Sequence, residues 1–172
     1  MKYNTPVLEG RKEDFNEAPN MLWDAFHNFV EIGEYRVVAQ TDECVVIRLE
    51  NDTGEGDMIL YQVFDGIFLM YNDFHMSQYH SVYQAVDTVL AVDYCREGSL
   101  TMEWDNGMYC MKKTGSICID SSVHHKGITY LPTSHYHGIT IGFVNSLAEK
   151  TLEKNAAGIP INLKALRKKV LR

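Results

Sequence analysis

The sequence has little proline and little cysteine, and it lacks a long apolar run. Only 4 prolines and 4 cysteines occur among 172 residues. The cysteines show neither CxxC spacing nor the density of a disulfide scaffold, so we expect them to be small buried side chains. No apolar stretch approaches the roughly 20 residues that cross a bilayer, and the polar first residues differ from a signal peptide. We therefore expect a cytoplasmic protein without membrane contact.

An excess of positive charge is also missing. The chain has 23 acidic and 16 basic residues, which gives a formal net charge of −7. Affinity for nucleic acid depends mainly on clustered lysine and arginine. The densest basic cluster lies near the C-terminus, on a predicted helix whose negative dipole end it complements. We expect this chain not to bind DNA by itself.

Motifs for nucleophilic catalysis and for phosphate binding are lacking too. The sequence contains no GxSxG elbow and no cysteine in a protease signature. Gly54 and Gly56 match the first glycines of a GxGxxG loop, but no third glycine and no helical pattern follow. The sequence therefore gives no support for nucleophilic catalysis or for a phosphate-binding loop.

Short apolar strands separated by turn residues dominate the chain from residue 35 onward. In the stretch 87–120, Gly98, Asn106-Gly107 and Gly115 provide the positive φ angles that turns and hairpins need. Strands are predicted at 35–40, 44–50, 58–64, 67–74, 81–86 and 88–95. The last of these is expected to end at Glu97-Gly98, and the polar segment 51–57 is expected to be a loop.

Two later strands show alternation. Leu100, Met102 and Trp104 share one face of a half-buried strand. The stretch after His135 also alternates, and one of its faces carries His135, His137, Ile139, Ile141 and Phe143. Because three of these five residues are large and apolar, we expect both histidines to lie on the core face.

Helical periodicity is confined to the two ends of the chain. It predicts a helix over 19–30, which begins with a proline in its first turn. After Asn145, the residues Ser146 to Glu149 have the pattern of a capping box. Asn162 can cap a last helix.

Many short strands with helices only at the ends predict a mainly β fold. The expected architecture is an antiparallel jelly-roll barrel, the cupin-like double-stranded β-helix, with one N-terminal and two C-terminal helices. The 45% hydrophobic content suits one core of this size. Such a barrel can enclose a small molecule in a cavity lined by alternate residues.

Several stretches in one order resemble a known family. They are Tyr61–Phe64, Tyr71–Met76, Glu97-Gly98, Thr114–Ser116 and Pro132–Ile139. In this order they are similar to the N-terminal cupin-type domain of AraC-family transcription regulators. The resemblance implies an effector-sensing barrel over 1–145, a dimerisation segment over 146–172, and a separate helix-turn-helix module that would follow this chain.

The same resemblance implies a regulatory domain that is not an enzyme and needs no cofactor. It also implies partners and site residues. The expected partners are a small-molecule effector and a second copy of the chain, with DNA contacted only through the C-terminal module. The expected effector pocket contains His75, Tyr94, Trp104, His135 and His137. The expected dimerisation residues are Leu147, Leu152, Leu163, Leu166 and Val170. Residues 1–16 are expected to form an arm over the pocket.

A metal site is the alternative that the histidines offer. The HxH pair His135 and His137 has the spacing for two ligands on a strand, and His124 and His125 precede it closely. Metal-binding cupins, however, carry HxH early and follow it with a glutamate. The main hypothesis therefore includes no metal, and the alternative is a free-standing, metal-dependent cupin enzyme that acts on a small molecule.

Overall fold

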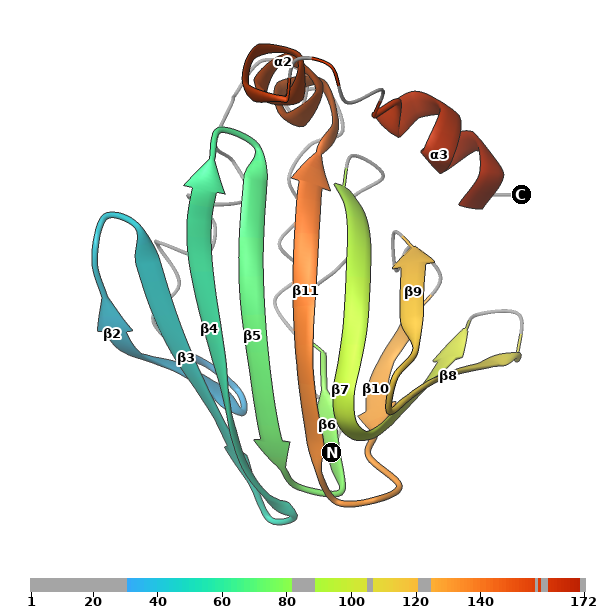
Figure 1. Cartoon of the computed structure of the whole chain (residues 1–172). Helices are drawn as coiled ribbons and strands as arrows, with labels where there is room; N and C mark the ends of the chain where they lie inside the picture. The colour runs from blue at the N-terminus through green and yellow to red at the C-terminus, as the bar shows by residue number, and fades with distance from the viewer. Residues whose placement is uncertain are drawn as a thin grey trace.

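A computed structural model of the chain describes residues 31–81, 89–104, 107–120, 125–156, 158 and 161–170. Within these residues the chain forms an 11-stranded antiparallel sheet and two helices (Figure 1). The mainly β, cupin-like roll predicted from the sequence is confirmed. The predicted N-terminal arm, the helix at 19–30 and all but the first residue of the predicted strand at 81–86 lie outside the described residues.

The predicted strands at 35–40, 44–50 and 67–74 recur with small changes at their ends. The strands are β1 (Glu31–Ile32), β2 (Tyr35–Gln40), β3 (Cys44–Asn51), β4 (Gly54–Phe64), β5 (Ile67–His75), β6 (Gln78–His80), β7 (Val89–Trp104), β8 (Tyr109–Lys113), β9 (Ile117–Asp120), β10 (His125–Tyr130) and β11 (Tyr136–Val144). The helices are α2 (Asn145–Asn155) and α3 (Leu163–Val170). Short turns such as Asp65-Gly66 join neighbouring strands.

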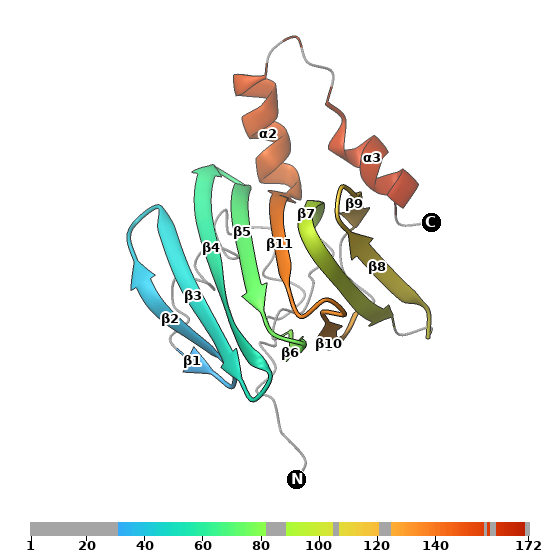
Figure 2. The ribbon, with the colours of Figure 1, turned by 60° about the horizontal axis from the view of Figure 1, so that its bottom comes forward.

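The strands follow the order β1-β2-β3-β4-β5-β11-β7-β10-β6, and β8 and β9 also pair with β7. We call β1 to β5, β11, β9 and the first half of β7 the large sheet. The second half of β7 with β8, β10 and β6 is the small sheet. Figure 2 shows β6 and β10 of the small sheet near the end of the large sheet that is opposite the two helices.

Strand β7 belongs to both sheets. Its first half pairs with β11 and β9, and its second half pairs with β8 and β10. It changes sheet at Gly98, where φ is +77° and an added Cβ would lie 1.9 Å from the carbonyl oxygen of His135. The prediction that a strand ends at Glu97-Gly98 is therefore wrong, because the strand bends there and continues.

The segment 54–57 also differs from its prediction. It was expected to be a loop, but it forms the start of β4, and only Asp52 and Thr53 make the turn from β3. Two hydrogen bonds of 2.8 Å from Arg48 to the Asp57 carboxylate link the two strands. Cross-strand pairing thus replaces the apolar content that the segment lacks.

The inner face of the large sheet is identified by its burial. Val45, Ile47 and Leu49 of β3 are at most 3% exposed. The same face continues across the sheet from Ile47. Its successive cross-strand partners are Met58 on β4, Asn72 on β5, Gly138 on β11 and Cys95 on β7. The small sheet covers this face with residues that include Leu100 and Met102 of β7. These residues, with Leu131 just after β10, belong to the main core cluster.

The helices cover one end of the outer face. Ala148 and Leu163 form a second core cluster with Ile67 and Leu90. Asn162 caps α3, since its side chain accepts a hydrogen bond from the Ala165 amide at 2.8 Å, as predicted. The predicted capping box is wrong, because β11 runs directly into α2 at Asn145 without a side-chain cap. Neither described helix is long and apolar enough to span a membrane.

The bend in β7 can be tested with two glycines that share nearly the same φ. We expect Gly98→Ala to lower the free energy of unfolding by at least about 2 kcal/mol more than Gly115→Ala. Gly115 has φ of +81° but nothing within 4 Å of its added Cβ, so only the backbone conformation is penalised there. Urea denaturation of both variants measures the difference; equal losses would contradict the steric argument.

Candidate functional site

A buried group of charges lies inside the roll. Lys112 of β8 donates a hydrogen bond from Nζ to Asp93 Oδ2 at 2.5 Å and lies 3.5 Å from Asp120 Oδ2. The side chains of these three residues are only 7%, 9% and 13% exposed, in the same order. We call them the inner charge cluster. One lysine and two aspartates give the cluster a formal charge of −1.

The two sheets bring these residues together. Asp93 lies on β7 before the bend, opposite Thr140 of β11 and Cys118 of β9. Lys112 lies on β8, which pairs with the part of β7 beyond the bend. Folding β7 over at Gly98 therefore turns Lys112 toward Asp93.

Hydrogen bonding completes the surroundings of the cluster. Thr140 donates a hydrogen bond from Oγ1 to Asp93 Oδ1 at 2.5 Å, so both oxygens of this carboxylate are bonded. Burial alone would lower the pKa of Lys112, but attraction by Asp93 and Asp120 outweighs burial and raises it. Lys112 is therefore a cation at neutral pH. Burial also raises the pKa of the neighbouring Tyr136 phenol, which stays neutral.

Three thiols share this interior. Cys95, Cys110 and Cys118 are free, and burial raises the pKa of each, although Lys112 acts in the opposite direction. They are therefore protonated at neutral pH and are weak nucleophiles. Arg96, next to Cys95 in the sequence, does not activate it, because the arginine pairs with Glu97 instead.

Sequence analysis missed the inner charge cluster. The one indication in the sequence was a charged residue, Asp93, within the apolar stretch that forms β7. A charged residue there indicates a buried site only when the strand register shows that its side chain faces inward. The partner, Lys112, is on a different strand, and the sequence gives no spacing that relates the two.

The predicted pocket residues lie elsewhere. His137 is on the outer face of the large sheet, where Tyr94 is 41% exposed and Ile141 is 38% exposed. The prediction that the two histidines share the core face is therefore wrong. The inner face of β11 carries Tyr136, Gly138, Thr140 and Gly142, all buried. The side chain of Trp104 lies outside the described residues.

Glycine explains why the apolar residues of β11 point outward. An added Cβ at Gly142 would lie 1.9 Å from the ring of Phe68 on β5, so the aromatic ring occupies the space that a side chain would need. The same arrangement recurs between Gly56 and Phe74. Aromatic residues of one strand thus cover glycines of the next, and the glycine face is the core face.

A second polar group lies at the end of the outer face. His75 Nε2 is 3.2 Å from Asp73 Oδ1, and the His75 and His135 rings are 4.8 Å apart. His135 Nε2 is 3.5 Å from Glu97 Oε2. His137 is not part of this group and faces Tyr71, with ring centroids 5.9 Å apart. Of the alternative metal ligands, His124 and the side chain of His125 lie outside the described residues.

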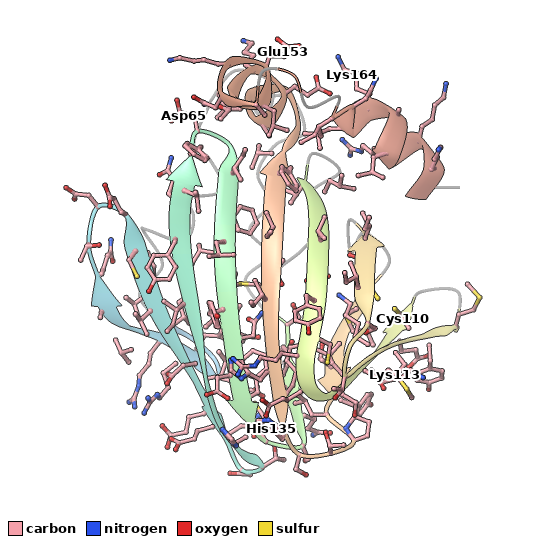
Figure 3. The ribbon with its side chains drawn as sticks, viewed as in Figure 1. Asp65, Cys110, Lys113, His135, Glu153 and Lys164 are labelled. Carbon is pink, nitrogen blue, oxygen red and sulfur yellow. The ribbon has the colours of Figure 1, made fainter. Side chains whose placement is uncertain are left out.

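The predicted dimerisation residues are largely used within the chain. Leu163 is buried, Leu152 and Leu166 pack against the same cluster, and Leu147 is close to Gly66. The side chain of Val170 lies outside the described residues. Figure 3 shows that charged residues such as Glu153 and Lys164 project from the helices. Dimerisation through these helices stays a prediction, and a partner would meet charged side chains.

Neither a protein-family profile nor a curated protein sequence matches this chain. Similar solved structures include ectoine synthase from P. lautus, with 12% identity, a TM-score of 0.42, and coverage of 69% of this chain and 80% of the synthase. A cupin superfamily protein from Desulfitobacterium hafniense DCB-2 has 9% identity, a TM-score of 0.39, and coverage of 56% and 84%.

A regulator is also among the similar structures. The HTH_3 family transcriptional regulator from Vibrio cholerae has 13% identity and a TM-score of 0.36, and the match covers 50% of each chain. This chain therefore spans half the length of that regulator. The description of this fold as a two-sheet roll depends on the strand order and register, and not on these similarities.

The prediction that the chain is not an enzyme is wrong. It followed from the resemblance to transcription regulators, yet an enzyme, ectoine synthase, is among the similar structures. Missing motifs exclude the reactions that need them and no others.

The inner charge cluster makes a prediction about stability. Lys112→Met leaves two buried carboxylates without a counter-charge and should lower the free energy of unfolding by about 3–5 kcal/mol at pH 7. Adding Asp93→Asn and Asp120→Asn should recover most of the loss. The control is Lys113→Met, an exposed neighbour, with an expected change within about 0.5 kcal/mol. Equal effects at 112 and 113 would contradict the argument.

The buried thiols predict a loss of stability in alkali. Their folded pKa values lie above the ordinary value of 9.0, so the folded state keeps protons that the unfolded state releases. The free energy of unfolding should therefore fall as pH rises from about 8 to 10, by at most about 1.4 kcal/mol per pH unit for each thiol. Replacing the three cysteines with alanine should flatten this dependence in urea denaturation; an unchanged slope would contradict it.

Proposed function

We propose that the chain is the regulatory domain of an AraC-type transcription regulator and that a small effector binds on the inner face of the large sheet, beside the inner charge cluster. The observation that carries the proposal is the burial of Lys112 with Asp93 and Asp120. Buried ion pairs are often no more stabilising than apolar residues of similar size. Charges kept in a core are therefore candidates for recognition.

The burial of the inner face suggests the direction from which the effector arrives. Toward the end covered by the small sheet, Leu49, Phe74 and Tyr136 are at most 5% exposed. Toward the end that carries α2, the inner-face residues Phe68 and Met70 are half-buried. The register places Asp93 in the same cross-strand row as Met70, and Asp120 in the same row as Phe68. An effector that entered from the α2 end would therefore reach the inner charge cluster.

The side chains favour a certain effector chemistry. The cluster has a formal charge of −1, which favours neutral or cationic groups that donate hydrogen bonds. Phe68 and Met70 offer an apolar surface next to it. The proposed effector is accordingly a small molecule with hydroxyl or amino groups and a compact apolar part.

The link from the site to the helices supports a regulatory role. Thr140, which bonds to Asp93, lies on β11, and this strand runs directly into α2. An effector that binds one position of β11 better than another would bias the position of α2 and α3. In the family that this chain resembles, the helices that follow the barrel form the contact between two protomers. We propose that α2 and α3 form such a contact with a second copy of this chain.

Binding can be tested by thermal shift with a panel of sugars, polyols, amino acids and polyamines. A true effector at about 100 times its Kd should raise Tm by about 5–10 °C. We expect Asp120→Asn to abolish the shift, and Asp65→Asn, an exposed turn residue, to retain it. An equal shift in both variants would place the effector away from the inner charge cluster.

Regulation needs a separate test. The chain can be fused to a helix-turn-helix module that binds its operator only as a dimer, and transcription from a reporter can be measured with the identified effector. We expect an effector-dependent change in the reporter that Asp120→Asn removes. A ligand that binds but never changes the reporter would support a binding protein instead of a regulator.

A further inference from the structure

We propose that Asp73, His75 and His135 form a binding site for a divalent transition-metal ion on the outer face of the large sheet. Each of these residues offers one ligand atom, and the three atoms lie within 4.8 Å of one another. Among the described residues this is the one group of three or more such side chains that comes together in this way. Figure 3 shows His135 at the end of the sheet opposite Asp65 and the helices.

The donor set suits the ion. Two imidazoles and one carboxylate form a combination that binds zinc and iron(II) with positions left open for water. Tetrahedral ligand atoms about 2.0–2.2 Å from zinc lie about 3.3–3.6 Å from one another. The side chains of His75 and Asp73 are 62% and 53% exposed, so they can rotate to close the remaining gap.

The backbone holds the two histidines in place. The carbonyl oxygen of His75 lies 2.0 Å from the position of an added Cβ at Gly54, and that of His135 lies 1.9 Å from the same position at Gly98. The His135 carbonyl also accepts a hydrogen bond from Thr133 Oγ1 at 2.8 Å. Both ligands are thus attached to closely packed backbone, which lowers the entropy lost on binding an ion.

The bonding of the His135 ring is incomplete. Its Nδ1 atom is buried and has no hydrogen-bond partner among the described residues, which is uncommon for a buried polar atom. Its Nε2 atom lies 3.5 Å from Glu97 Oε2. Glu97 is therefore positioned to serve as a fourth donor or to orient the ring.

The proposed metal site is separate from the inner charge cluster. Asp73 and His75 point outward, while their neighbours Asn72 and Phe74 are buried on the inner face. The large sheet lies between the two sites. Loss of the metal and loss of effector binding are therefore independent results.

The test uses the whole chain, freed of metal with a chelator, and zinc chloride alone as the probe. We expect isothermal titration to give one zinc per chain. His75→Gln and His135→Gln should each weaken binding by at least about 100-fold, because even partners outside the ligand set contribute about 10–100-fold. Cobalt(II) in place of zinc should give an absorption spectrum without a thiolate charge-transfer band, which distinguishes these ligands from the cysteines.

The matched control is His80→Gln. His80 is also an exposed histidine beside a carboxylate, with Nδ1 2.9 Å from Glu34 Oε1, but it is outside the group. The His80→Gln variant should bind zinc with the same affinity as the unmodified chain. Circular dichroism should show that the variants at 75, 80 and 135 are all folded. Asp73→Asn provides a second test that spares both histidines. Zinc binding that survives in all of the Asp73, His75 and His135 variants, a thiolate band with cobalt, or no heat of binding would each overturn the proposal.

Discussion

The close contact between Gly98 and the carbonyl group of His135 determines much of this structure. It lets β7 turn from the large sheet into the small one without a break. The first half of the strand then presents Asp93 to the interior, and the second half carries β8 and Lys112 back over it. The same contact holds His135 at the outer rim. One backbone contact thus positions the inner charge cluster and the proposed metal site.

Much of the fold could be predicted because it depends on local patterns. Glycine-punctuated apolar stretches identified most strands, and Asn162 identified the start of α3. The bend at Gly98 and the early part of β4 were missed for a common reason. Both depend on pairing with distant residues, such as His135 for the bend and Arg48 for β4, and a single segment carries no record of such partners.

The site was harder to predict than the fold. Alternation in β11 was identified correctly, but the apolar side was assigned to the core. The structure reverses the assignment because Phe68 occupies the space above Gly142, so the glycine side is the buried one. Hydrophobicity alone does not distinguish two faces of a strand when a neighbour supplies the bulk. The inner charge cluster was missed because its members are on three separate strands.

The burial of one lysine with two aspartates has a consequence for the evolution of this protein. A change of Lys112 alone leaves two buried carboxylates without a counter-charge, whereas a coordinated change of all three residues to neutral ones does not. Related sequences that lack Lys112 should therefore also lack Asp93 and Asp120. Such linked substitution would separate the descendants into lineages with a charged interior and lineages with a neutral one.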